Sequence, residues 1–350
     1  MELVFVKQGV RSYGHIEAGI ERAASEIAGL ALRTLDLSRH YFAQAGELRA
    51  APHPRRMQEA AKVLLAELLR DRGETVLLLN GFVLESHLPG FFRALKGAGK
   101  RIAGWQIDEP YYVDKNRAFA KELDLLLSVD SSTVPLYREM GVKTELLPLA
   151  CDPALHRSYE PAAPYACEVC FVGAPFAGSR RTRLIDRIAP CLARHDTRIV
   201  GATELDSWKK SLAHSALLER AIRDEPVSTA QAARYFSGAR VNLNLHKDSY
   251  GHAWDRNAAR IEARSPNERS FAIAGCGGFQ LMDDTRPDLA RFFAPGGEVV
   301  TFSDAADLEQ KIDYYLAHED ERRAIAAAAQ ARAYREHTYR HRLEAVLALL

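Results

Sequence analysis

Short apolar runs alternate with helical patterns along the first part of the chain. One helical pattern covers residues 55–71, where Ala60, Val63, Leu64 and Leu68 recur at a three-and-four spacing and form one apolar stripe. Strands separated by helices predict a parallel sheet that helices cover on both faces. The apolar runs that predict strands are residues 3–7, 31–37, 75–81, 101–108, 125–130 and 144–149.

A proline-rich stretch, residues 151–166, interrupts the alternation and predicts a linker between two domains. The alternation then begins again, with strands expected at residues 167–173, 197–201, 241–246, 278–283 and 298–302 and helices at 304–318 and 320–336. We therefore expect an α/β protein of two Rossmann-like, doubly wound domains, residues 1–150 and 167–337, that face each other across a cleft. Residues 338–350 predict an amphipathic helix that packs back on the N-terminal domain.

Composition and charge support this picture. The 350 residues exceed the roughly 250–300 at which a single hydrophobic core stops growing. Hydrophobic residues make up 47% and charged residues 27% of the chain, which is typical of folded globular proteins. With 47 Lys and Arg against 46 Asp and Glu, the net charge of +1 gives no reason to expect nucleic-acid binding.

The opening residues MELVFVKQG have neither the basic region nor the long apolar region of a signal peptide. Apolar runs also stay well short of the roughly 18 residues that a membrane-spanning helix needs. We therefore expect a cytoplasmic protein without a transmembrane segment. The scattered cysteines predict reduced thiols, and Cys167 and Cys170, three apart in a strand, are expected to point to opposite faces and to chelate a metal poorly.

Ligands bind parallel sheets at the carboxyl ends of the strands, so polar residues at strand ends are the candidates for chemistry. The stretch GAPFAGSRR follows the strand at 167–173 and precedes a helix. Gly173 permits close approach of the backbone, the helix start offers free N–H groups, and Arg180 or Arg181 can bind a phosphate. The alternative is a solvated loop, but arginines do not favour the positive end of a helix dipole unless an anion is near.

The stretch NERSFAIAGCGG places Asn267, Arg269 and Ser270 at the start of a second helix. Asn267 can simply cap this helix, and Gly277-Gly278 can simply end it. Arg269 is unfavourable on a first turn unless an anionic ligand or a carboxylate compensates. Asn244 and His246, at another strand end, complete the candidates of this half.

Fingerprints of other nucleotide-binding classes are absent: no G-x-G-x-x-G follows the first strand, and no P-loop is present. Asp283-Asp284 fits a turn better than a metal site, and His, Cys and Asp do not cluster at metal-binding spacing, so we expect no metal. The polar loop over residues 247–266 is either a mobile cover over a ligand or a solvated loop.

The second half of the chain resembles the donor-binding half of GT-B glycosyltransferases, in the branch of the CgeB-like spore maturation proteins. The resemblance rests on the ordered blocks NERSFAIAGCGGFQLMDD, LARFFAPGGEVVTF, DLEQKIDYYLAHEDERRAIA and REHTYRHRL, preceded by CEVCFVGAPFAGSRR and RVNLNLH. The first half is similar in outline, through GWQIDEPYY and LLLSVDSSTVPLYREMGVKTELLPLACDP.

In that family a nucleotide-sugar lies between the domains, so the resemblance implies an N-terminal acceptor domain and a C-terminal donor domain. Relatives often carry a Glu after the Phe of the N-x-R-x-F pattern, which holds the ribose hydroxyls. This chain has Ala272 there, so Glu268 or Glu298 substitutes, the nucleotide is bound differently, or activity is lost. The donor-binding candidates are Gly173, Arg180, Arg181, Asn244, His246, Asn267, Arg269, Ser270, Gly277, Gly278 and Glu298.

The predicted function is a glycosyltransferase that uses a nucleotide-sugar as donor, with no cofactor and no active-site metal. Arginines and helix N–H groups can stabilise the charge on the departing diphosphate. The acceptor is a glycan, a protein or a small molecule, and the base that takes its proton can be Asp108, Glu109 or His15. Asp108 is the first choice, although the sequence Asp-Glu-Pro is also typical of an ordinary turn. The alternatives are a nucleotide-sugar epimerase of the same fold and an inactive nucleotide-sugar binding protein.

Overall fold

The computed structural model divides the chain into two compact units. Unit 1 comprises Met1–Leu149, Ser249–Ala263 and Tyr339–Leu350, and unit 2 comprises Ala150–Asp248 and Arg264–Thr338. The structure describes residues 2–8, 13–38, 54–201, 207–223 and 227–350.

Unit 1 is built on a six-stranded parallel sheet. Its strands are β1 (Glu2–Lys7), β2 (Ala31–Asp36), β3 (Thr75–Leu79), β4 (Arg101–Gln106), β5 (Leu125–Ser128) and β6 (Thr144–Leu146), in the spatial order β2-β1-β3-β4-β5-β6. All five residues of β3 are buried, as expected for a parallel strand that helices cover on both faces.

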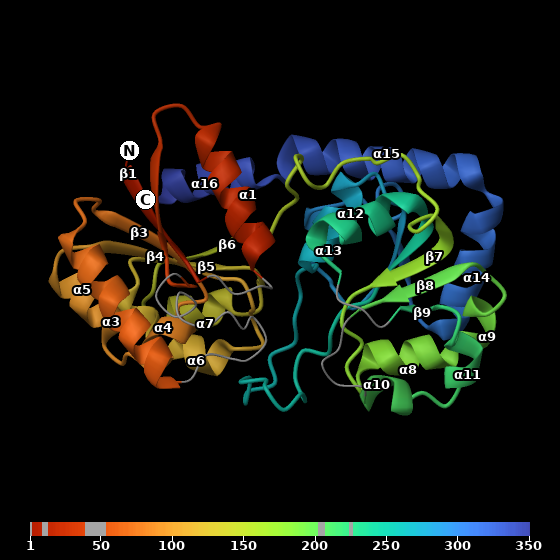
Figure 1. The fold of residues 1–350 in the computed structure, drawn as a ribbon, viewed down its shortest axis with the longest axis horizontal. Helices are drawn as coiled ribbons and strands as arrows, with labels where there is room; N and C mark the ends of the chain where they lie inside the picture. The colour runs from red at the N-terminus through yellow and green to blue at the C-terminus, as the bar shows by residue number, and fades with distance from the viewer. Residues whose placement is uncertain (1, 9–12, 39–53, 202–206, 224–226) are drawn as a thin grey trace. The chain divides into compact units, whose positions relative to one another are not determined.

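The helices of unit 1 lie on both faces of this sheet (Figure 1). They are α1 (Gly14–Ser25), α3 (Pro54–Arg70), α4 (Phe82–His87), α5 (Phe91–Gly97), α6 (Val113–Arg117), α7 (Val134–Glu139) and α16 (Tyr339–Leu349). Helices α1 and α16 share one face, where the rings of Trp105 and Tyr339 are 6.5 Å apart. Helices α3, α4 and α5 form a continuous apolar core with the other face.

Unit 2 repeats the same plan. Its strands are β7 (Cys167–Val172), β8 (Thr197–Val200), β9 (Ile222–Arg223), β10 (Ala239–Asn244), β11 (Gln280–Asp283) and β12 (Val300–Phe302), in the order β12-β11-β10-β7-β8-β9 and all parallel. Its helices are α8 (Arg180–Arg187), α9 (Ala189–Leu192), α10 (Ser207–Lys210), α11 (Ser215–Leu218), α12 (Thr229–Gly238), α13 (Glu268–Gly275), α14 (Ala305–Ala317) and α15 (Glu319–Glu336).

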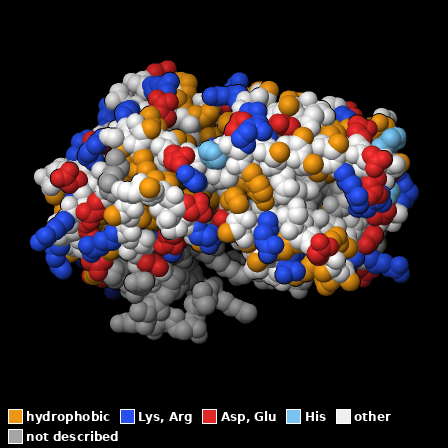
Figure 2. Space-filling model, turned by 90° about the horizontal axis from the view of Figure 1, so that it is seen from above, with side chains coloured by type: hydrophobic (Ala, Val, Ile, Leu, Met, Phe, Trp, Pro, Cys, Tyr) orange, Lys and Arg blue, Asp and Glu red, His pale blue; other side chains and the backbone are white. Residues whose placement is uncertain are grey.

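The two faces of the unit 2 sheet carry separate cores. Phe171 and Leu243 point to the face covered by α8, α9 and α14, while Cys170 and Val172 point to the face covered by α12 and α13. On the molecular face shown in Figure 2, basic and acidic side chains are interspersed, in keeping with the balanced charge of the chain.

The predicted α/β fold of two doubly wound domains is confirmed, and every predicted strand has its counterpart. The sequence analysis missed β9, which is only two residues long. It also missed α12, although Ser228 and Gln231 form the capping box that marks its start.

Two segments lie elsewhere than predicted. Residues 249–263, expected in the second domain, belong to unit 1, where the Arg256 N–H donates to Tyr111 O (2.7 Å) and the Asp114 N–H donates to Arg256 O (2.9 Å). Main-chain bonds of this kind leave no signal in the pattern of side chains. The predicted linker belongs to unit 2, where the Cys151 N–H donates to His337 O (2.9 Å).

The cysteine predictions are confirmed in one respect and wrong in another. All five cysteines, Cys151, Cys167, Cys170, Cys191 and Cys276, are free and buried. However, Cys167 and Cys170 lie in the same apolar cluster, and burial, together with the neighbouring Cys167 thiol, raises the pKa of Cys170. Cys167 is the first residue of β7, where the regular alternation of side chains does not yet hold.

Candidate active site

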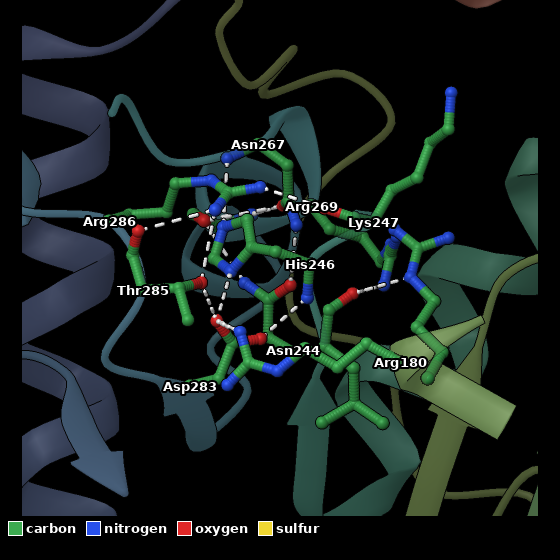
Figure 3. Close-up of polar contacts among 12 residues, drawn as sticks. Arg180, Asn244, His246, Lys247, Asn267, Arg269, Asp283, Thr285 and Arg286 are labelled. Carbon is green, nitrogen blue, oxygen red and sulfur yellow. Dashed lines mark hydrogen bonds and ion pairs between the residues drawn. The ribbon is translucent and has the colours of Figure 1, made fainter. Parts of the chain in front are cut away.

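The topology of unit 2 brings three strand ends together at one edge of the sheet. Strands β7, β10 and β11 are neighbours and parallel, so their carboxyl ends meet. Gly173 follows β7, His246 lies two residues after β10, and Asp283 ends β11. Helices α8 and α13 begin at the same edge, because each follows one of these strands. Figure 3 shows the polar side chains that gather there, which we call the donor-side cluster: Arg180, Asn244, His246, Lys247, Asn267, Arg269, Asp283, Thr285 and Arg286.

His246 and Asp283 form the buried centre of the donor-side cluster, each with 2% of its side chain exposed. The His246 N–H donates to Asp283 Oδ2 (2.6 Å), and His246 Nδ1 lies 3.2 Å from Asp283 Oδ1. His246 Nε2 accepts from the Asn267 N–H (3.3 Å), so the ring proton is on Nδ1 and the imidazole is neutral. Burial lowers the pKa of His246 to about 4, against the raising effect of Asp283.

Asp283 is an anchored carboxylate. Burial would raise its pKa, but hydrogen bonds from the His246 ring, the Thr285 hydroxyl and the His246 N–H hold the pKa well below its usual range. The ionised carboxylate attracts Arg180, whose Nη1 lies 3.6 Å from Asp283 Oδ1. Arg180 therefore reaches from α8 to the end of β11 with about a third of its side chain, 34%, exposed.

A second set of buried side chains fixes the start of α13. Asn244 donates from Nδ2 to Ser270 Oγ (3.0 Å) and to Gln280 Oε1 (2.9 Å), and its Oδ1 accepts from Asn267 Nδ2 (2.9 Å). Asn267 also caps the helix, because its Oδ1 accepts from the Ser270 N–H (3.1 Å). Asn244 and Ser270 are fully buried and hold Asn267 in place, and their contact with a ligand stays a prediction.

Arg181 and Arg269, each near the start of a helix, both donate to the carbonyl oxygen of Leu245, Arg181 from Nε (2.8 Å) and Arg269 from Nη1 (3.4 Å), but their other surroundings differ. Arg181 is buried and donates from Nε to Leu245 O (2.8 Å) and from Nη1 to Ala174 O (3.2 Å). In this structure the guanidinium of Arg181 ties the loop after β7 to the end of β10, and its predicted contact with phosphate stays a prediction. Arg269 is half-buried, stands 5.7 Å over the Phe171 ring, and lies beside Gly173.

Gly173 makes this position of Arg269 possible. A Cβ atom at residue 173 would lie 3.3 Å from Arg269 Cζ, closer than most real contacts. The guanidinium of Arg269 and the backbone of the loop after β7 can therefore approach the same space, as a phosphate-binding loop requires.

The amino end of α8 already faces a negative group of the chain itself. Ser179 caps the helix, and the Arg180 N–H donates to Asp248 Oδ2 (2.8 Å). Arg183 Nη2 lies 3.8 Å from the same carboxylate. In this structure Asp248 therefore supplies the negative charge that basic residues at a helix start need.

Three other candidates, Gly277, Gly278 and Glu298, lie at the amino edge of the unit 2 sheet, opposite the donor-side cluster. Helix α13 runs from the carboxyl edge back to the amino edge, about 12 Å over its eight residues, and Gly277 and Gly278 end it there. The Gly277 N–H donates to Ala274 O (2.9 Å) and the Gly278 N–H to Ile273 O (3.0 Å). Glu298 precedes β12 and accepts from the Ala294 N–H (2.8 Å), so it closes its own turn. The roles of these three residues around the nucleotide stay predictions, and in this structure all three lie at the amino edge, away from the donor-side cluster.

The three candidate bases of unit 1 have unlike surroundings. Asp108 is half-buried after β4 and accepts from Tyr13 and Asn80. Glu109 is 3% exposed and accepts from Asn116 Nδ2 (2.7 Å) and from the Tyr137 hydroxyl; burial raises the pKa of Glu109 to about 7. Glu109 points into the core, and its role as a base stays a prediction. His15 is half-buried in the first turn of α1.

Comparisons with known proteins agree with this architecture. Residues 180–348 match a family described as "Glycosyl transferase-like". The Spore protein CgeB of Bacillus subtilis is 26% identical over 239 residues, which cover 67% of this chain and 70% of that protein. The predicted resemblance to CgeB-like GT-B glycosyltransferases is confirmed.

The fold of this chain is also that of solved GT-B structures. Anabaena HepE in complex with UDP-glucose superimposes with a TM-score of 0.68 at 12% identity, over all of both chains. Sucrose-phosphate synthase from Thermosynechococcus elongatus gives 0.65 at 13% identity, over 100% of this chain and 98% of that one. The UDP-GlcNAc 2-epimerase of Neisseria meningitidis bound to UDP-GlcNAc gives 0.57 at 10% identity, over 100% and 99%.

Asp283 and Arg286 are residues of the site that the sequence pattern did not predict. Asp283 was assigned to a turn, and Thr285 indeed bonds to it, but the carboxylate also orders His246 and Arg180. Arg286 is buried, with Nη2 donating to Lys247 O (3.0 Å). The signal that could have revealed Asp283 is its place at the end of a strand next to β10.

Within the ranges that the structure describes, the side chains able to hold a metal together are Cys191, His195 and Asp313. His195 immediately precedes β8, so this group lies at the amino edge, away from the donor-side cluster. A search of the same ranges also finds that their helices are too short or too polar to cross a membrane.

Proposed function

We propose that the chain transfers a sugar from a nucleotide-sugar donor to an acceptor, and that the donor-side cluster binds the diphosphate without a metal. One observation carries the proposal: Arg269, Arg180 and the start of α13 meet at the carboxyl edge of β7, β10 and β11, which is where parallel sheets bind ligands. The UDP-glucose bound by Anabaena HepE and the UDP named in the S. aureus MnaA structure support a nucleotide-sugar as ligand.

Arg269 is the residue to which we assign the diphosphate. It is half-buried beside Gly173 and follows the cap residue Asn267, so its charge adds to the positive end of α13. As the bond between the anomeric carbon and the diphosphate oxygen breaks, the oxygen keeps the electron pair and becomes more negative. A cation and oriented N–H groups at that point lower the barrier.

Arg180 would also bind the diphosphate, once its guanidinium has exchanged Asp283 for a phosphate. Its guanidinium is paired with Asp283, and its N–H is bonded to Asp248. A diphosphate near α8 offers a stronger, doubly charged partner for both groups. Glu268, in the first turn of α13, is at the same edge, whereas Glu298 accepts from the Ala294 N–H in its own turn, so we assign the ribose hydroxyls to Glu268.

In an inverting transfer the acceptor hydroxyl needs a base, and we assign this role to Asp108. The hydroxyl oxygen forms the bond to the anomeric carbon, its proton passes to the carboxylate, and the nucleoside diphosphate leaves with the electron pair. Among the three predicted bases Asp108 alone is a half-buried carboxylate at a strand end.

An epimerase is the second candidate, because UDP-GlcNAc 2-epimerases share the fold. The two differ in whether the donor reacts alone. A first screen by thermal shift with UDP, GDP, dTDP and CMP would select the nucleotide, since a ligand of the native state raises its Tm. Nucleotide release from the matching sugar that depends on an added acceptor supports transfer. Interconversion of the sugar without acceptor supports the epimerase, and binding without either reaction supports an inactive binding protein.

The alanine at position 272 does not by itself indicate that activity is lost. Its side chain is 5% exposed and packs with Ile273 in the apolar cluster between α13 and the sheet. In this chain position 272 is a core position, so an alanine there fits the packing of the helix.

A further inference from the structure

Three side chains of unit 1, from three segments, form a closed hydrogen-bonded triangle. The Tyr13 hydroxyl donates to Asp108 Oδ2 (2.6 Å), Asn80 Nδ2 donates to the same oxygen (2.5 Å), and Asn80 Nδ2 also lies 2.9 Å from the Tyr13 oxygen. Tyr13 precedes α1, Asn80 follows β3 and Asp108 follows β4. We propose that Tyr13 and Asn80 are positioning residues that fix the rotation and the proton affinity of the Asp108 carboxylate.

Asn80 is held rigidly for this task. It is fully buried, and its backbone has a φ of 42°, a left-handed conformation that asparagine tolerates better than most residues. Its Oδ1 accepts from the Ile107 N–H (2.9 Å), its N–H donates to Trp105 O (2.9 Å), and its O accepts from Gln8 Nε2 (3.0 Å). Residues in sparsely populated backbone conformations that their surroundings hold in place are frequent at functional sites.

Tyr13 supplies the second donor. Burial raises the pKa of its hydroxyl, and the Asp108 carboxylate raises it further, so the hydroxyl keeps its proton and gives it to Asp108 Oδ2. Because the Tyr13 hydroxyl accepts from Asn80 Nδ2, its own proton is free to point to Asp108 Oδ2. Two donors on one oxygen hold the carboxylate plane at a fixed rotation, which a base that must meet an acceptor hydroxyl needs.

The same two bonds restrain the basicity of Asp108. Donors that bind the charged form of a carboxylate make it harder to protonate. Among the described residues, Tyr112 and Glu109, in the segment that follows β4, are further titratable groups near this carboxylate, and their influence stays when Tyr13 is changed. Loss of the Tyr13 hydroxyl should therefore act on Asp108 in one direction only, toward easier protonation.

This inference rests on the proposed function, in which Asp108 takes the proton of the acceptor. The test compares Tyr13→Phe with Tyr112→Phe as the matched control, because Tyr112 stacks on Phe82 near Asp108 and its ring remains. In Tyr13→Phe the acidic limb of the pH profile of kcat/KM is expected to shift upward by about one pH unit. In Tyr112→Phe the limb should stay within about 0.3 units of the wild-type profile.

A measurement independent of turnover separates this proposal from the proposed function. The 13C carboxylate resonance of Asp108, assigned with Asp108→Asn, is titrated in the wild type and in both Phe variants. A titration that moves to higher pH in Tyr13→Phe alone, together with the shifted limb, supports the positioning role. Profiles and titrations that superimpose on the wild type, even with lower activity, would overturn it. If the wild-type protein transfers no sugar, the proposed function fails, whereas the NMR titration still decides whether the two donors act on Asp108.

A second variant tests the other donor. Asn80→Gly keeps a residue that accepts a positive φ while it removes both side-chain bonds to the triangle. The titration of Asp108 should again move to higher pH, and the Tm should fall because the Ile107 N–H loses its partner. An unchanged titration in a folded Asn80→Gly protein would contradict a role for Asn80.

Discussion

Three arginines near the carboxyl edge of unit 2 show how surroundings decide the task of a residue. Arg181 is buried and fully engaged with main-chain oxygens, so it stabilises a loop. Arg180 is paired with Asp283 and one-third exposed, and Arg269 lies over an aromatic ring beside a glycine. In the sequence, Arg180 and Arg181 are adjacent and equivalent, and only the direction of each side chain on α8 separates them.

His246 makes stability depend on pH in a defined window. Burial lowers its pKa to about 4 in the native state, whereas a histidine in the unfolded chain titrates near 6.5. The unfolded state then binds more protons below pH 6.5, so the stabilisation is complete above that pH and is lost as the pH falls to about 4. We expect the free energy of unfolding to drop by about 1–3 kcal/mol over this interval.

Urea denaturation at a series of pH values between 7.5 and 4.5 checks this expectation. His246→Gln removes the titrating group, so its stability, though lower throughout, should fall less steeply with acid. The control is His318→Gln, at an exposed position at the end of α14, which should retain the wild-type slope. Equal slopes for the wild type and His246→Gln would show that His246 is not a buried neutral base.

Much of the site was predictable from strand ends, and the failures have physical causes. Gly173, Arg180, Asn267 and Arg269 were found because each stands where a strand pattern gives way to a helix pattern. Asn244 and Ser270 were found too, but the sequence does not show whether a polar side chain faces a ligand or another buried side chain. Asp283 was undervalued because its partner His246 is thirty-seven residues away in the sequence.

Helix α13 illustrates why residues close in sequence can have separate tasks. Its first residues join the donor-side cluster, and its last ones end at Gly277, whose φ is 68° and whose absent Cβ would lie 2.8 Å from Ser158 Oγ. Gly277→Ala should therefore lower the free energy of unfolding by about 1–3 kcal/mol and leave nucleotide affinity unchanged.

Thermal denaturation and nucleotide titration of the same Gly277→Ala sample check both halves of this prediction. Gly297→Ala is the matched control, since a Cβ there meets its nearest atom only at 4.0 Å and φ is not positive. Weaker nucleotide binding by a folded Gly277→Ala protein would restore the original assignment of this turn to the ligand.

Helix α8 gives a prediction about competition for its amino end. Asp248 accepts from the Arg180 N–H and lies near Arg183, so its charge opposes that of an incoming diphosphate. Asp248→Asn removes the charge and should tighten binding of the diphosphate about fivefold. Isothermal titration measures the affinity, with Asp313→Asn as a control at an exposed ion pair of α14. Unchanged or weaker binding by Asp248→Asn would argue against an anion site at α8.

Taken as a whole, the chain builds one fold twice and interleaves the two copies in sequence. The hydrophobic pattern predicts both sheets, because parallel strands covered on two faces are nearly continuous apolar runs. It does not predict that residues 249–263 return to unit 1, because main-chain hydrogen bonds to Tyr111 and Asp114 hold this polar loop there. Loops of this kind are assigned by geometry and not by composition.

The central claim is that Arg269 binds the phosphates of a nucleotide-sugar. Isothermal titration tests this directly, with a nucleoside diphosphate and with its nucleoside as the two ligands. The proteins compared are the wild type, Arg269→Ala and the control Arg194→Ala, since Arg194 forms an exposed ion pair with Asp313. The expected result is at least about a tenfold loss for the diphosphate in Arg269→Ala alone, and no more than about a twofold change for the nucleoside. Equal losses for the two ligands would contradict the claim.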